Sequence, residues 1–96
     1  MKTTIDFLNA VKTRHNIQRD ADLARLLEIT PPAIASYKKG HSSLSDENAY
    51  KVALLLGISP EYTMACANAE RAQNEKVKFV WTRLAGRLNE DWKQAA

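Results

Sequence analysis

The sequence has few of the residues that build cross-linked, metal-bound or membrane-spanning structures. It contains one cysteine, Cys66, and two histidines in 96 residues, which excludes an intramolecular disulfide and a clustered Cys/His metal site. No apolar run approaches the roughly 20 residues of a membrane span. The opening stretch, MKTTIDFLNAVKTRH, lacks the apolar core of a signal peptide. We therefore expect a soluble, cytoplasmic protein with no metal, no cofactor and no membrane partner.

Signatures of catalysis are also scarce. The three glycines, Gly40, Gly57 and Gly86, are isolated from one another, which excludes a glycine-rich phosphate-binding loop. The few carboxylates occur at expected helix starts, where the helix dipole accounts for them. No Ser/His/Asp or Cys/His pairing has its partners. The sequence therefore predicts no catalytic residues, no enzyme activity and no evident small-molecule ligand.

What the chain does contain is a helical, mildly basic pattern. Its 96 residues suffice for one small core, and 45% of them are hydrophobic. Apolar residues recur with helical spacing throughout, and long period-two alternation is absent. The net charge of +3 permits binding to nucleic acid without requiring it. We expect an all-α protein.

Capping residues and prolines predict the helix boundaries. A first helix starts near Thr3 or Thr4, ends about residues 15–16, and points Ile5, Leu8 and Val11 inward. N-caps are then expected at Asp20, Thr30, Ser45 and Ser59, and a sixth helix from about Asn74. Cys66 falls on the apolar face of the fifth helix, as a buried small hydrophobe.

Residues 20–40, DADLARLLEITPPAIASYKKG, predict two short helices joined by a three-residue turn. Leu23, Ala24 and Leu27 form the apolar stripe of the first helix, and Ile34 and Tyr37 of the second face back toward it. This spacing is that of a helix-turn-helix. It leaves outside the core a small, polar and basic face that suits a DNA groove: Pro31, Pro32, Ala33, Ala35, Ser36, Lys38 and Lys39.

This motif and the later segment ALLLGISPE (residues 53–61) resemble the phage repressor and Cro family of helix-turn-helix regulators. The resemblance covers about residues 20–64. It implies a five-helix Cro/repressor-like DNA-binding domain in residues 1–72, followed by an additional C-terminal helix in residues 73–96. The whole pattern is most similar to small regulators of filamentous phages and prophages, which work in the bacterial host cytoplasm. The implied function is transcriptional regulation by occupying a double-stranded DNA operator.

The sequence departs from the family pattern at three places. Glu28 stands in the tight turn where the family usually has Gly, at a cost of order 1 kcal/mol. Asp20-Ala21-Asp22 replaces a region where many members grip a phosphate with Gln, so Arg19 or Arg14 would take that role. Pro31-Pro32-Ala33 replaces residues that often read base edges, so direct readout is thin and DNA shape should carry part of the specificity.

Two sets of DNA contacts are expected from the motif placement. Lysines and serines suit phosphates and base edges, while Pro and Ala suit thymine methyls. The base or groove contacts are Pro31, Pro32, Ala33, Ser36 and Lys39. The phosphate contacts are Arg19, Thr30, Lys38, Lys39, His41, Ser42 and Ser43.

The C-terminal helix carries an apolar stripe at two-helix-seam spacing, formed by Val77, Val80, Trp81, Leu84 and Leu88. The stripe is either a homodimer interface, extended by Trp92, or core packed on the chain's own first and fifth helices. A dimer would place two recognition helices about one DNA turn apart, roughly 34 Å. Two alternatives stay open: an antitoxin-type autoregulator using this helix to bind a partner, and a helical protein–protein interaction module without DNA binding.

Overall fold

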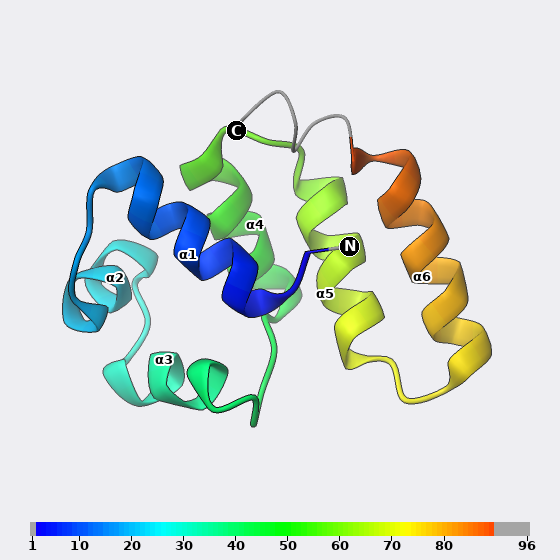
Figure 1. The fold of residues 1–96 in the computed structure, drawn as a ribbon, viewed down its shortest axis with the longest axis horizontal. Helices are drawn as coiled ribbons and strands as arrows, with labels where there is room; N and C mark the ends of the chain where they lie inside the picture. The colour runs from blue at the N-terminus through cyan, green and yellow to red at the C-terminus, as the bar shows by residue number, and fades with distance from the viewer. Residues whose placement is uncertain (1, 90–96) are drawn as a thin grey trace.

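The computed structural model describes residues 2–89, which form six α-helices and no strand (Figure 1). The all-α expectation is confirmed, and each helix begins within two residues of its predicted start. Trp92 lies outside the described residues. The helices are α1 (Thr4–His15), α2 (Asp20–Leu27), α3 (Pro31–Lys38), α4 (Asp46–Leu56), α5 (Pro60–Arg71) and α6 (Glu75–Arg87).

The helix starts are fixed mostly by the expected caps. The side chains of Thr3, Thr30 and Ser45 each accept a hydrogen bond from a backbone N–H in the first turn that follows. The prediction that Asp20 caps α2 is wrong, because Arg19 is the N-cap residue and the Asp20 carboxylate is bound by lysines instead. The Ser59 hydroxyl makes no capping bond either, since it donates to Glu61.

Left-handed residues end α1 and α2. Asn16 (φ 55°) follows α1, and Glu28 (φ 58°) occupies the turn after α2. The backbone N–H of Glu28 donates to the carbonyls of Ala24 and Arg25. The strained position expected in the helix-turn-helix turn is therefore confirmed, and hydrogen bonds to the last turn of α2 hold it.

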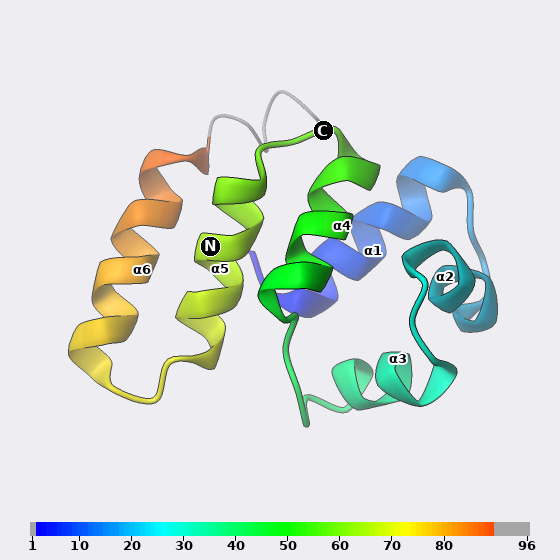
Figure 2. The same cartoon turned by 180° about the vertical axis from the view of Figure 1, so that it is seen from behind.

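The core lies between α1, α4 and α5, with α2 and α3 closing one end of the molecule and α6 flanking α5 at the other (Figures 1 and 2). Phe7 is 1% exposed and meets Tyr62 edge-on, with ring centroids 6.0 Å apart. The prediction that Ile5 points inward is wrong, because Ile5 is 37% exposed and Phe7 takes the inner face of α1 with Leu8 and Val11. Cys66 is fully buried, and burial raises the pKa of its thiol.

The apolar stripe of α6 divides between core and surface. Trp81 and Leu88 pack against the core and Ala85 is buried, so this side of the helix lies on α5. Val77, Val80 and Leu84 remain 47%, 50% and 38% exposed. Because they lie three and four residues apart, they form one strip along the helix. We call these three residues the α6 strip.

Candidate nucleic-acid interface

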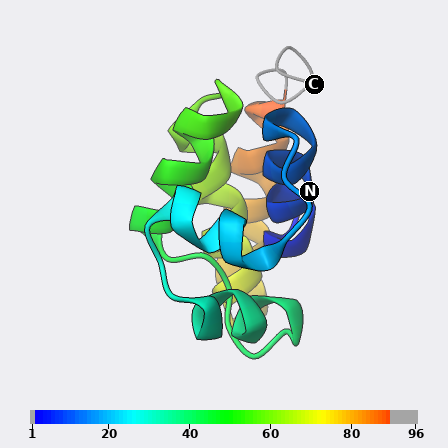
Figure 3. The ribbon, with the colours of Figure 1, turned by 90° about the vertical axis from the view of Figure 1, so that its left-hand side faces the viewer.

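Helix α3 lies at one edge of the molecule, with α1 and α2 on its inner side (Figures 1 and 3). The Thr30 side chain accepts a hydrogen bond from the Ala33 N–H, and Pro31 takes the first helical position, where it loses no bond. Ile34 and Tyr37 are 1% and 6% exposed and anchor the inner face. The outer face is open, as predicted, with Pro31, Pro32, Ala35, Lys38 and Lys39 exposed and Ala33 and Ser36 partly so.

Polar contacts also fix α3 and its neighbour. The Tyr37 hydroxyl accepts a hydrogen bond from the Asn48 side chain of α4 at 2.9 Å. Lys51, also on α4, donates to the carbonyl of Leu27 at the end of α2. Since α4 belongs to the core, these bonds hold the helix-turn-helix in a set orientation on the rest of the protein.

Lys38 is held by a carboxylate. Its Nζ lies 2.7 Å from Oδ2 of Asp20, while Nζ of Lys12 lies 2.7 Å from Oδ1 of the same residue. Hydrogen bonds from these two ammonium groups hold the pKa of the Asp20 carboxyl below its ordinary value. The carboxylate near the expected phosphate clamp is thus ionised and bridges α1, α2 and α3.

Lys39 differs from its neighbour Lys38 in its surroundings. Within residues 2–89, neither Lys39 nor His41 has an ion pair, and both are exposed. The Ser36 and Ser42 hydroxyls lie 2.8 Å apart and hydrogen-bond each other. Ser36, predicted to contact a base, and Ser42, predicted to contact a phosphate, are therefore neighbours on one surface.

The loop after α3 is pinned at Leu44, which is 0% exposed. The Leu44 N–H donates to Oγ1 of Thr4 at 3.0 Å, and its carbonyl accepts from the Arg71 guanidinium. The Thr4 hydroxyl in turn donates to Glu70 at 2.7 Å, and Arg71 pairs with Asp46 at 2.9 Å. These contacts place Ser42 and Ser43 beside the end of α3. These contacts are not predictable from the sequence, because no local pattern links residues 4, 44 and 71.

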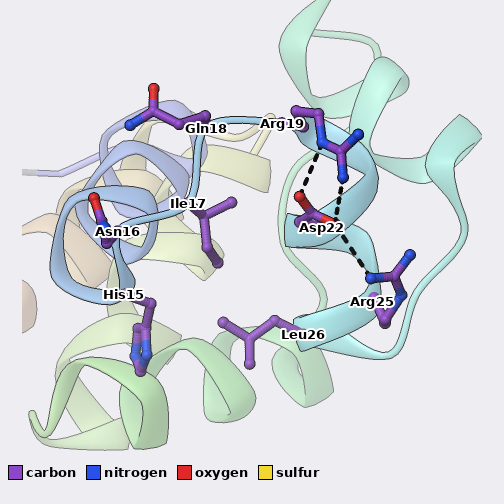
Figure 4. A pocket seen from close by; sticks show the side chains of 8 residues that line it. All are labelled: His15, Asn16, Ile17, Gln18, Arg19, Asp22, Arg25 and Leu26. Atoms are coloured by element: carbon purple, nitrogen blue, oxygen red, sulfur yellow. Dashed lines mark hydrogen bonds and ion pairs between the residues drawn. The ribbon is translucent and has the colours of Figure 1, made fainter.

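Arg19 lies beside a surface groove formed by the end of α1 and the face of α2 (Figure 4). Its Nε donates to Oδ2 of Asp22 at 3.1 Å, and Arg25 donates to the other carboxylate oxygen at 3.2 Å. Both arginine side chains stay largely exposed. The guanidinium of the alternative clamp, Arg14, lies against Gly57 at the end of α4 that points away from α3. Of the two candidates for the phosphate clamp, Arg19 is the one that lies next to the start of α2.

Among the described residues no group of three His, Cys, Asp or Glu side chains is placed to hold a metal ion. Helices long and apolar enough to cross a membrane are likewise not found between residues 2 and 89.

Comparison with protein-family models matches residues 9–62 to the helix-turn-helix family. This span runs from the middle of α1 to the start of α5 and includes the whole surface described above. Comparison with curated proteins and with solved structures gives no match. Because the family model covers more than half of the chain, the protein belongs to the Cro/C1-type helix-turn-helix family of DNA-binding regulators.

Proposed function

We propose that this protein is a sequence-specific transcriptional regulator of the phage or prophage repressor and Cro kind, which acts by occupying its operator. One observation carries the proposal. The chain from Ile29 to Ser45 contains no acidic residue, and it forms the exposed face of α3 and the pinned loop that follows. A rigid surface of lysine, serine and apolar groups, on a segment that contributes no carboxylate of its own, suits the phosphate-lined major groove.

Base readout is proposed to come from both ends of α3. Pro31, Pro32 and Ala33 offer apolar contact to thymine methyl groups, since none of them has a side-chain hydrogen-bonding group. Ser36 and Lys39 offer hydrogen bonds to base edges further along the same face. With so few polar readers, the shape and deformability of the site supply the remaining specificity.

Phosphate contacts are proposed on both sides of this face. Lys39 and His41 carry exposed groups without ion pairs among residues 2–89. Among the residues that the structure describes, the Ser42 hydroxyl is paired with the Ser36 hydroxyl alone, so it retains capacity for a phosphate oxygen. The proposed set is Arg19, Thr30, Lys38, Lys39, His41, Ser42 and Ser43.

We propose further that residues 73–96 serve dimerisation, while residues 1–72 bind DNA. The α6 strip is apolar and exposed, and such a surface is commonly an interface. Since α6 and α3 lie toward opposite ends of the molecule (Figure 1), pairing through α6 leaves both recognition helices uncovered. A symmetric dimer then reads a pseudo-palindrome whose half-sites lie one helical turn or a multiple apart, with one turn being roughly 34 Å.

The test is fluorescence anisotropy with DNA from upstream of the protein's own gene and with scrambled DNA, over a salt series. We expect selective binding to the upstream DNA. For 6–10 phosphate contacts, affinity should fall by about 10³–10⁵ between 50 and 200 mM salt. Equal weak binding to both DNAs would contradict control of its own promoter, and no binding at any salt would contradict the proposal as a whole.

The α6 strip also supports a second candidate, an antitoxin-type autoregulator. In that case the α6 strip binds a partner protein instead of a second copy of this chain. Purification from the native host distinguishes the two, because an antitoxin should elute with a stoichiometric partner while a repressor should elute alone. A pure interaction module would likewise bring a partner but would show no salt-dependent DNA affinity.

A further inference from the structure

Three helices meet at Asp20. Lys12 comes from α1 and Lys38 from the last turn of α3, and each ammonium nitrogen lies 2.7 Å from a different oxygen of the Asp20 carboxylate. All three side chains line one small cleft, of about 50 Å³, between these helices. Its walls are otherwise mostly apolar, with Leu8, Leu23 and Ile34 among them. The Asp20 carboxylate therefore pairs with two cations at once.

We propose that Asp20 is an internal competitor of the DNA phosphates, which occupies Lys38 and Lys12 and so lowers the affinity of the protein for DNA in general. The inference rests on the proposed function. Carboxylate and phosphate are both oxyanions that accept charge-assisted hydrogen bonds from an ammonium group. A phosphate that reaches Lys38 must share it with a carboxylate of like charge or displace that carboxylate.

The exposed fractions of Lys38 and Lys12 indicate which of the two a DNA phosphate can reach. The Lys38 side chain is 55% exposed, whereas that of Lys12 is 24% exposed. An ammonium group has three donors, so Lys38 keeps donors that face solvent while one is bound to Asp20. Lys38 is therefore the cation that DNA reaches first, and Lys12 keeps Asp20 in place.

The charge balance gives the expected consequence. Two ammonium groups and one carboxylate together carry one net positive charge, and removing the carboxylate leaves two. Each phosphate newly neutralised on duplex DNA steepens the plot of log K against log salt by about 0.9. Because this phosphate term does not depend on sequence, Asp20 lowers the affinity for scrambled DNA and for the operator alike.

The test measures, by fluorescence anisotropy, the affinity of Asp20→Asn for scrambled DNA between 50 and 200 mM salt. We expect tighter binding than wild type and a slope steeper by about 0.9, so the gain in affinity at 50 mM should be about 3.5 times the gain at 200 mM. Asp20→Gln repeats the test with a different neutral side chain if Asp20→Asn fails to fold. Circular dichroism confirms that each variant is helical.

Two controls separate this effect from a change in net charge or in stability. Glu61→Gln removes one negative charge in the first turn of α5, at the end of the molecule away from α3 (Figure 1), and should leave the slope unchanged. Adding Lys38→Gln to Asp20→Asn should cancel most of the steeper slope.

An unchanged slope in folded Asp20→Asn, or an equal change in Glu61→Gln, would overturn the inference while the wild-type binding still supports the proposed function. If neither wild type nor Asp20→Asn binds DNA, the proposed function fails and this inference fails with it.

Discussion

Lys38 and Lys39 are neighbours in the sequence, yet their side chains have different surroundings. Lys38 is bound to Asp20, while Lys39 is exposed and lacks an ion pair within residues 2–89. Lys39→Gln should therefore weaken binding to all DNA and reduce the salt slope by about 0.9. Anisotropy over a salt series measures both effects. Arg87→Gln, a charge removed at the far end of α6, is the matched control, and an equal loss in that variant would argue against a specific Lys39 contact.

At the level of single residues, which side chains of α3 are exposed was predictable, and which side chains they pair with was not. The outward positions of Pro31, Pro32 and Lys39 follow from helical spacing, because Ile34 and Tyr37 fix which side of α3 faces in. The pairing of Asp20 with Lys38 spans 18 residues and depends on how α2 crosses α3. Spacing on one helix contains no information about that crossing, so Asp20 was expected to be a cap.

The turn between α2 and α3 places a glutamate where the backbone favours glycine. Glu28 has φ 58°, and its helix-ending bonds come from the backbone, not from its side chain. Glu28→Gly should therefore raise the free energy of unfolding, by about 0.5–1 kcal/mol, because the left-handed penalty exceeds the added freedom of the unfolded chain. Urea unfolding measures the change. Asn16→Gly should gain less, since Asn tolerates this conformation better; equal gains at both positions would contradict the argument.

The helices were more predictable than the contacts that position them. Local signals such as Thr30 before Pro31, or Ser45 before two acids, set helix ends and were confirmed. The inner face of α1 was assigned wrongly, because Ile5 and Phe7 are both apolar and periodicity alone does not say which one meets Tyr62. The anchoring of the loop after α3 joins residues from α1, that loop and α5, which only the folded chain brings together.

Two carboxylates connect helices across the molecule, and both should make its stability depend on pH. Hydrogen bonds from Lys12 and Lys38 lower the pKa of Asp20, and a hydrogen bond from Arg71 lowers that of Asp46. A carboxyl with a lowered folded-state pKa stabilises the fold above its unfolded pKa of about 3.9, and this contribution is lost as pH falls below that value. The melting temperature should therefore drop between pH 5 and pH 2.5.

Asp20→Asn and Asp46→Asn separate these two contributions. Each variant should be less stable than wild type at pH 7 and should lose less on acidification, because the group that titrates is gone. Thermal unfolding followed by circular dichroism at both pH values measures this. An acid-induced loss as large as that of wild type in both variants would mean that other carboxyl groups dominate.

One part of the apolar side of α6 packs on the core and the other part is exposed, and substitutions can test the two parts separately. Trp81 packs against the core, so Trp81→Ala should lower the free energy of unfolding by about 2 kcal/mol, less than for a fully buried tryptophan.

Val80 belongs to the α6 strip and is 50% exposed, so Val80→Glu should leave the helical content unchanged. If the strip joins two copies, sedimentation equilibrium should show a dimer for wild type and a monomer for Val80→Glu. That variant should also lose affinity for a palindromic site far more than for a half-site, because only the palindrome requires two subunits together. A folded Val80→Glu protein that remains dimeric would place the interface elsewhere than the α6 strip.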